Sequence, residues 1–201
     1  MSISIVLSLV ALTISGFTLW LTHLRKGNIK MTQPTVIFIG NDGNETRSPK
    51  IYLRTLLYST SKKGQIVENF YVKMRRGESV QNFNVWVYGN EKLFRGSGLF
   101  IGQEGVTFNH HFLLPKDGTD FRFLAGVYSL EVYCNIIGSK SSRCLQNIRL
   151  TLSEKEAIAL DNIKMGIYFD WGPDAREYNK FIEEKPQQNI EGDFLKLFTN
   201  K

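Results

Sequence analysis

Two patterns of hydrophobic and polar positions divide the chain. Residues 1–24 carry no ionised side chain and are mostly apolar, whereas apolar and polar residues alternate from Thr35 to Leu152. A period of two is typical of strands with one buried face. Gly, Pro, Asn, Asp or Ser interrupts the alternation at intervals of about ten residues, which is typical of strands joined by turns. The patterns therefore predict a mainly β protein, in which an N-terminal transmembrane helix precedes an antiparallel β-sandwich.

Eight strands are expected from the alternation. Their ranges are 35–39, 50–59, 67–75, 83–88, 98–102, 106–114, 127–137 and 143–152. Because residues two apart in a strand share a face, each strand has an identifiable core face. The strand at 127–137 points one set inward, namely Tyr128, Leu130, Val132, Cys134 and Ile136. In the strand at 83–88, the inward set is Phe83, Val85 and Val87.

Short C-terminal helices are expected after the last of these strands. Ser153 and Glu156 form a capping box, which predicts a helix immediately after them. Residues 166–174 are typical of a further short strand and turn. Asp174 then caps a final helix. The residues expected on that helix are Tyr178, Phe181 and Ile182.

The chain is predicted to hold one domain, because about 170 residues follow the helix and can bury a real core. Its expected parts are a transmembrane helix at 1–24, a basic juxtamembrane linker at 25–34, the sandwich with its helical extension at 35–184, and a polar tail at 185–201 with an amphipathic end.

The apolar segment has the length of a membrane span. As a helix that rises about 1.5 Å per residue, Ile3–Leu21 reaches about 28 Å, close to the thickness of the hydrocarbon layer. Trp20, Arg25, Lys26 and Lys30 flank its C-terminal end. Basic residues favour the cytoplasmic side. We therefore expect a single-pass protein of the inner (cell) membrane, with its N-terminus outside and its domain in the cytoplasm.

Two alternatives to a membrane anchor stay open. A cleaved signal sequence has a basic start and a short apolar core, whereas only Met1 and Ser2 precede this core, which continues past Gly16. A buried helix of a soluble protein usually keeps a polar face, but the small polar residues here leave no continuous one. Both alternatives fit the residues less well than an anchor does.

The charge balance bears on the partners. The chain has 25 basic and 19 acidic residues, a net charge of +6 and a pI near 9.3. Beyond the anchor, only Lys62-Lys63 and Arg75-Arg76 are adjacent basic pairs, and both lie beside glycine in expected turns. A nucleic-acid surface needs clustered basic residues. The expected partners are therefore the membrane and a protein, with no nucleic acid, and a homo-oligomer stays open.

The two cysteines, Cys134 and Cys144, lie on either side of the expected turn at 138–142. Alternation places both on inward positions, where they fill the core. A cytoplasmic location keeps them reduced, whereas a location outside favours a disulfide. Their spacing makes neither a zinc site nor a redox motif.

One segment carries a resemblance to a known family. Residues 123–133, with the sequence FLAGVYSLEVY, place Tyr128 two residues after a glycine at the start of a strand. This segment resembles the tyrosine corner of immunoglobulin-like and fibronectin type III-like sandwiches, in which the hydroxyl bonds back to the preceding loop. No early strand supplies a cysteine for Cys134, so the typical inter-sheet disulfide is excluded. As a whole, the chain is similar to small membrane-anchored bacterial proteins of uncharacterised function.

Few residues suggest catalysis. His110 and His111 alternate along one strand, so they face opposite ways and cannot both bind one metal ion. An inward pair of His110 and Cys134 is one route to a nucleophile, but no third residue marks an orienting group. Asp170 and Asp174 could form another acid and base pair or hold a cation, but a turn, with Asp174 as a helix cap, is the nearer explanation. We expect no catalytic residue, no cofactor and no metal.

The densest cluster of interaction-prone residues lies at 170–176, and an apolar group ends the tail. The candidates for partner binding are Asp170, Trp171, Asp174, Arg176, His111, Phe194, Leu195 and Phe198. The leading hypothesis is a non-enzymatic scaffold or accessory subunit whose immunoglobulin-like domain holds a protein partner at the membrane. The alternatives are a membrane-anchored hydrolase or metal-dependent enzyme, and an envelope or surface adhesion module with its domain outside.

Overall fold

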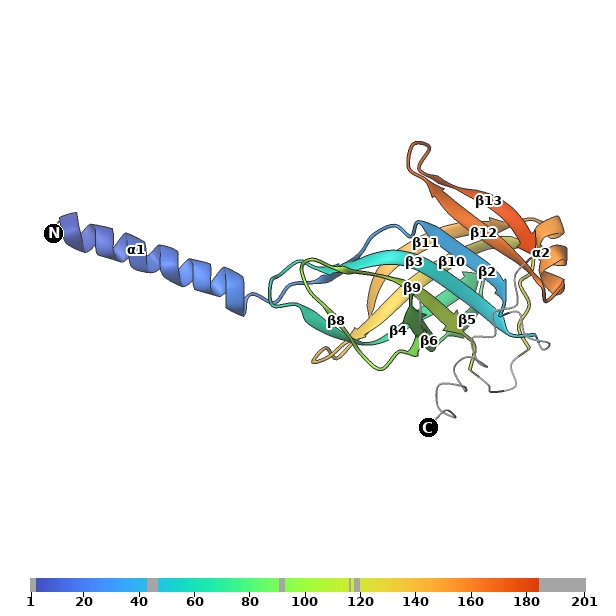
Figure 1. Cartoon of the computed structure of the whole chain (residues 1–201), viewed down its shortest axis with the longest axis horizontal. Helices are drawn as coiled ribbons and strands as arrows, with labels where there is room; N and C mark the ends of the chain where they lie inside the picture. The colour runs from blue at the N-terminus through green and yellow to red at the C-terminus, as the bar shows by residue number, and fades with distance from the viewer. Residues whose placement is uncertain (1–2, 43–46, 91–92, 116, 118–119, 185–201) are drawn as a thin grey trace.

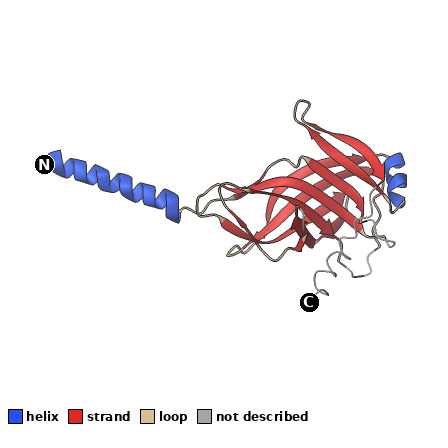
Figure 2. Ribbon diagram, in the orientation of Figure 1, coloured by secondary structure: helices blue, strands red, loops and turns tan. Residues whose placement is uncertain are grey.

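The computed structural model describes residues 3–42, 47–90, 93–115, 117 and 120–184. It is mainly β, as predicted, with two antiparallel sheets packed as a sandwich and an apolar helix at the N-terminus. Figure 1 shows that this helix projects from one end of the sandwich, while a short later helix lies at the other end. Figure 2 shows how strands dominate the rest of the chain.

The N-terminal helix comprises α1 (Ile3–Leu19) and a π-helical turn, η1 (Trp20–Leu24). None of its residues is buried against the sandwich. Several of its hydroxyl groups bond within the helix, because Ser8, Thr13 and Thr18 each donate to the carbonyl four residues earlier at 2.8–2.9 Å. The 22 residues are long and apolar enough to cross a membrane, a property that membrane anchors and signal sequences share.

Eight of the described strands form the first sheet. In spatial order they are β13 (Glu177–Glu184), β12 (Met165–Gly172), β2 (Val36–Asn41), β3 (Pro49–Ser59), β9 (Val106–Leu113), β6 (Val85–Gly89) and β7 (Phe94–Arg95), with β1 (Ile29–Met31) pairing beside β2 on β3. The second sheet has β11 (Arg143–Leu152), β10 (Gly126–Ile136), β4 (Gln65–Arg76) and β5 (Ser79–Phe83), with β8 (Leu99–Ile101) pairing on β4. Every pairing is antiparallel.

The core lies between the two sheets and is rich in aromatic rings. Phe70 on β4 reaches across to the first sheet, where its ring centre lies 5.3 Å from that of Phe112 and 5.8 Å from that of Trp86. The inward set predicted for the strand at 127–137 is confirmed, because all five of its members are buried. Full burial of one large apolar side chain stabilises the folded state by roughly 1.5–3 kcal/mol.

The predicted strand at 83–88 is two strands in different sheets. Phe83 pairs with Val72 in the second sheet, and Trp86 pairs with Phe112 in the first. Asn84 lies between them, so the chain changes sheets there and the inward parity changes with it. Trp86 therefore points into the core in place of the expected Val85 and Val87.

Two further strands were not expected. The segment at 25–34, expected as a linker, contains β1, whose Ile29 and Met31 are buried in the core. Three residues are too few for alternation to be recognised, and the basic neighbours of β1 hide it. The two-residue strand β7 is shorter still and was missed for the same reason.

The C-terminal region confirms one predicted helix and corrects another. The helix α2 (Glu154–Asp161) begins with the expected capping box, in which the backbone N–H of Glu156 donates to Ser153 Oγ at 3.3 Å and that of Ser153 donates to Glu156 Oε2 at 2.6 Å. The predicted final helix after Asp174 is wrong, because residues 177–184 form β13.

The hairpin of β12 and β13 explains that correction. Only four residues separate the strands, and Arg176 has a backbone φ of 56°, which turns the chain back at once. Across the pair, Phe181 stacks on Tyr168 with ring centres 5.2 Å apart. Such cross-strand contacts stabilise a strand in a segment that otherwise has the pattern of a helix.

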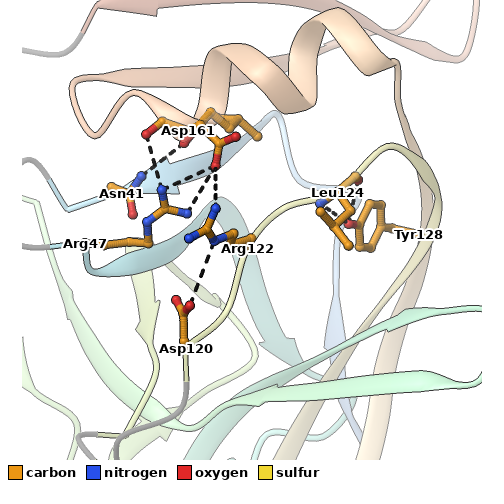
Figure 3. Close-up of polar contacts among 8 residues, drawn as sticks. Asn41, Arg47, Asp120, Arg122, Leu124, Tyr128 and Asp161 are labelled. Carbon is orange, nitrogen blue, oxygen red and sulfur yellow. Dashed lines mark hydrogen bonds and ion pairs between the residues drawn. The ribbon is translucent and has the colours of Figure 1, made fainter.

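The tyrosine corner predicted at Tyr128 is present as a local structure. The Tyr128 hydroxyl accepts from the Leu124 backbone N–H at 2.9 Å and donates to the Leu124 carbonyl at 2.7 Å (Figure 3). Gly126 between them has a φ of 140°, which side chains rarely adopt. The two bonds therefore fix the path by which the chain enters β10.

We expect Tyr128→Phe to lower the free energy of unfolding by about 2 kcal/mol, because it removes two hydrogen bonds and keeps the ring. Denaturant unfolding in detergent, followed by tryptophan fluorescence, measures this change. Tyr71→Phe is the matched control, because Tyr71 stacks on Tyr133 and its hydroxyl bonds no described residue. Equal effects of the two substitutions would contradict a role for the corner.

Candidate partner-binding surface

The turn between β12 and β13 carries two of the predicted contact residues. Asp174 and Arg176 are exposed at this turn, which the Arg176 backbone N–H closes by donating to the Gly172 carbonyl at 2.8 Å. Asp170 lies further back on β12, half-buried, where it pairs with Asn179 of β13. The tip therefore presents one acid and one base to solvent.

Trp171 on β12 packs against the other strand of the hairpin. Its ring meets that of Tyr178 edge to face, with centres 5.0 Å apart. The Tyr178 hydroxyl donates to the Pro34 carbonyl at 2.9 Å and accepts from Gln33 Nε2 at 2.8 Å. Burial raises the pKa of Tyr178, so this hydroxyl stays protonated. Trp171 is thus half-buried, and its ring mainly packs against Tyr178 and offers little surface to a partner.

The strand β13 forms one edge of the first sheet. It pairs with β12 on one side and with no described strand on the other, so one row of backbone groups is open for pairing. Phe181 and Ile182 are exposed along this edge strand. An unpaired edge with apolar side chains is the feature to which an extended segment adds as a further strand.

The charges of β13 restrict what can add to it. Lys180 is neutralised by Glu156 of α2, with Nζ and Oε1 2.8 Å apart. Glu177, Glu183 and Glu184 remain exposed, with no ion pair to another described residue. Acidic side chains along an edge discourage pairing between identical copies and favour a basic partner. Sequence reasoning missed this edge because it expected a helix there.

His111 does not provide the exposed contact expected of it. It is 8% exposed, on the opposite face of β9 from His110, and its ring lies 5.0 Å from that of Tyr52. The predicted division of the two histidines between the faces of the sheet is therefore present. The role of His111 is corrected to a buried position within the fold.

His110 and Cys134 face the core from opposite sheets. Trp86 Nε1 donates to His110 Nδ1 at 3.2 Å, and the His110 ring meets Phe70 edge to face at 5.0 Å. Burial lowers the pKa of His110 to about 3 and raises the pKa of the Cys134 thiol to about 11. A catalytic pair needs a thiolate and a base that titrates near the working pH. Both groups are neutral here and act as core residues.

The two cysteines lie on different faces, which corrects the inward position expected for Cys144. A register shift at Val132 and Tyr133 leaves Cys144 paired with Tyr133, while Cys134 pairs with Arg143. Leu145 packs against the core in the place expected for the thiol. Cys144 is exposed and Cys134 is buried, and both are free thiols.

The remaining candidates fall in three places. Trp20 stacks on Phe17 in the N-terminal helix, and Arg25 and Lys26 are exposed just after it. Lys30 is exposed on β1 and so belongs to the sandwich. The tail residues lie outside the described part of the chain, namely Phe194, Leu195 and Phe198.

An ion cluster lies at the end of the sandwich near α2 and was not anticipated (Figure 3). Arg47 donates to Asp161 Oδ1 through both Nη atoms at 3.2 and 3.3 Å. Arg122 lies 4.0 Å from the same carboxylate and 3.9 Å from Asp120. These exposed pairs tie α2 to two loops that are distant in the sequence. Each such pair stabilises by about 0–1 kcal/mol.

A shallow cavity of about 340 Å³ lies beside this cluster, with Arg76 and Arg122 among its lining residues. Arg76 is already engaged, because its Nη1 donates to the Ala125 carbonyl at 3.2 Å. The same lining holds Asp120, which faces the positive charge of Arg122. Over the described residues, no group of three or more His, Cys, Asp or Glu side chains is arranged to hold a metal ion.

Comparison with known proteins gives little further information. No protein-family model matches the chain, and no curated protein matches it. Among solved structures, it is similar to Spo0M, the sporulation control protein from Bacillus subtilis, with 12% sequence identity, 84% of this chain and 71% of that chain covered, and a TM-score of 0.33. The similarity is distant and indicates nothing about what this chain binds.

The two thiols are expected to differ in reactivity. Under native conditions a thiol reagent should modify Cys144 and leave Cys134 intact, because burial withholds the second thiol and keeps it protonated. Mass spectrometry should show one modification, and a second only after unfolding. Cys144→Ser should abolish the native reaction while Cys134→Ser preserves it. Native modification of Cys134 in place of Cys144 would mean that the register shift between β10 and β11 lies at another position.

Proposed function

We propose that this chain is a non-enzymatic, single-pass protein of the inner membrane. Its immunoglobulin-like sandwich binds a protein partner and holds it at the membrane, as a scaffold or accessory subunit. The N-terminus lies outside and the sandwich lies in the cytoplasm, because Arg25, Lys26 and Lys30 all follow the apolar helix.

The observation that carries the proposal is the open edge of β13. A scaffold needs a recognition surface that does not depend on catalytic groups, and backbone groups along a sheet edge provide one. The exposed Phe181 and Ile182 supply apolar contact, and the nearby turn adds Asp174 and Arg176. His110 and Cys134, the pair with the clearest catalytic potential, are held neutral in the core.

The partner's chemistry follows from the side chains of the edge. A segment that adds to β13 is extended, with apolar residues opposite Phe181 and Ile182 and basic residues opposite Glu177, Glu183 and Glu184, so each of its faces carries both kinds. The charge pattern works against a second copy of this chain, since two such edges would bring acidic side chains together.

The orientation is testable with the protein's own thiol, since Cys144 is exposed. In cells that make the full chain, a thiol reagent that cannot pass the membrane is expected to label Cys144 only after the cells are opened. Cys144→Ser is the control for specificity, and the mass of the extracted protein shows whether residues 1–24 are retained. Labelling of intact cells would overturn the orientation and favour an envelope or adhesion role.

The binding edge is testable by photocrosslinking in cells. A photoreactive residue in place of Ile182 is expected to capture a protein of discrete size, because β13 would lie in the interface. The matched control replaces Ile158, an equally apolar residue that is 70% exposed on α2. Capture at both positions, or at neither, would count against the β13 edge. A product with the mass of two copies would identify self-association instead.

A further inference from the structure

The chain that leaves the N-terminal helix is fastened to the sandwich almost at once. The Gly27 backbone N–H donates to Ser61 Oγ at 3.1 Å. The Asn28 backbone N–H donates to Thr60 Oγ1 at 2.8 Å, and the Thr60 N–H donates back to the Asn28 carbonyl at 3.0 Å. Arg143 adds a bond from Nη1 to Asn28 Oδ1 at 2.7 Å. These contacts form a clamp between residues 27–28 and the end of the sandwich.

A glycine is required within the clamp. A Cβ at Gly27 would lie 2.6 Å from the backbone nitrogen of Ser61, closer than such atoms approach in proteins. The clamp therefore depends on a close backbone approach between two segments far apart in the sequence. Gln65 Nε2 donates to the Gly27 carbonyl and closes the same contact from the other side.

The clamp limits how far the sandwich can lie from the helix. The helix ends at Leu24, so only Arg25 and Lys26 separate it from Gly27. Three fully extended steps of the chain reach about 11 Å at most. When the helix crosses a bilayer, the clamped end of the sandwich is held within this distance of the helix end, at the level of the lipid headgroups.

The end of the sandwich that is held near the helix exposes large apolar side chains. Phe100 on β8 is 59% exposed, Ile66 on β4 is 43% exposed and Ile137 after β10 is 60% exposed. They are neighbours, because Ile66 pairs with Phe100 and the Ile137 N–H donates to the Ile66 carbonyl at 3.0 Å. We call these three residues the proximal patch. Figure 1 shows β8 and the turn after β10 at the α1 end of the sandwich.

Basic residues predominate around the proximal patch. Residues 60–68, 97–105 and 135–144 hold four basic side chains, Lys62, Lys63, Lys140 and Arg143, and two acidic ones, Glu68 and Glu104. Arg25 and Lys26 add two positive charges at the same end. Apolar side chains within a basic ring are the combination that binds an anionic lipid surface.

We propose that the proximal patch docks on the bilayer in which the helix is inserted. Phe100, Ile66 and Ile137 enter the interfacial layer, and the surrounding lysines contact anionic headgroups. This proposal rests on the membrane insertion of the proposed function. Its consequence is a fixed orientation, in which α2 lies farthest from the membrane and the hairpin of β12 and β13 projects to the side.

The test compares two ends of the full chain in reconstituted vesicles. An environment-sensitive fluorophore is attached to Ile137→Cys, or to Ile158→Cys on α2 as the matched control, each in a Cys144→Ser background. At position 137 we expect a blue-shifted emission, quenching by lipid-phase quenchers and loss of access to a water-soluble quencher. At position 158 the fluorophore should remain in water.

Charge is tested in the same system. Adding phosphatidylglycerol to phosphatidylcholine vesicles should increase lipid quenching of the fluorophore at position 137. Reversal of Lys62, Lys63 and Lys140 to Glu should abolish this increase. Flotation with the vesicles separates the two proposals: protein that does not float refutes membrane insertion. Protein that floats with position 137 in water refutes lipid docking alone. A patch shielded from both water and lipid would indicate a protein cover and would also overturn this proposal.

Discussion

The packing of the two sheets against one another is the constraint on which the fold depends, and Phe70 lies at its centre. The ring of Phe70 is buried and touches three rings of the opposite sheet, with centres 5.0 Å from His110, 5.3 Å from Phe112 and 5.8 Å from Trp86. Each sheet has one apolar face that only the other can cover. The neutrality of His110 follows from this packing, since a charged imidazole among these rings would lose its hydration.

The long strands were predictable because their burial is one-sided and regular. The strand at 126–136 alternates without interruption, so its core face could be identified from the sequence alone. Prediction failed where the period changes. The chain crosses between sheets at Asn84, and the register shift beside Tyr133 turns Cys144 outward. Neither event leaves a local sequence signal, because each depends on the strand that lies opposite.

The candidate surface was predictable only in part, because the contacts that make β13 a strand come from residues on another strand. The turn residues Asp174 and Arg176 were chosen by residue type, and both are exposed. The strand that follows was mistaken for a helix, because Tyr178, Phe181 and Ile182 have helical spacing and their partners lie on β12. The clamp at Gly27 joins segments more than thirty residues apart, so no local pattern reports it.

The clamp also determines how the protein carries mechanical load. Under the proposed function, a partner held on the sandwich and an anchor held in the membrane would pull on the chain at residues 25–28. Because β1 lies antiparallel to Leu57–Ser59 of β3, tension along β1 acts in shear, so that its hydrogen bonds are loaded together and not one after another. The junction between the N-terminal helix and the sandwich therefore resists extension, and under the proposed function the movement of a partner would be transmitted directly to the helix.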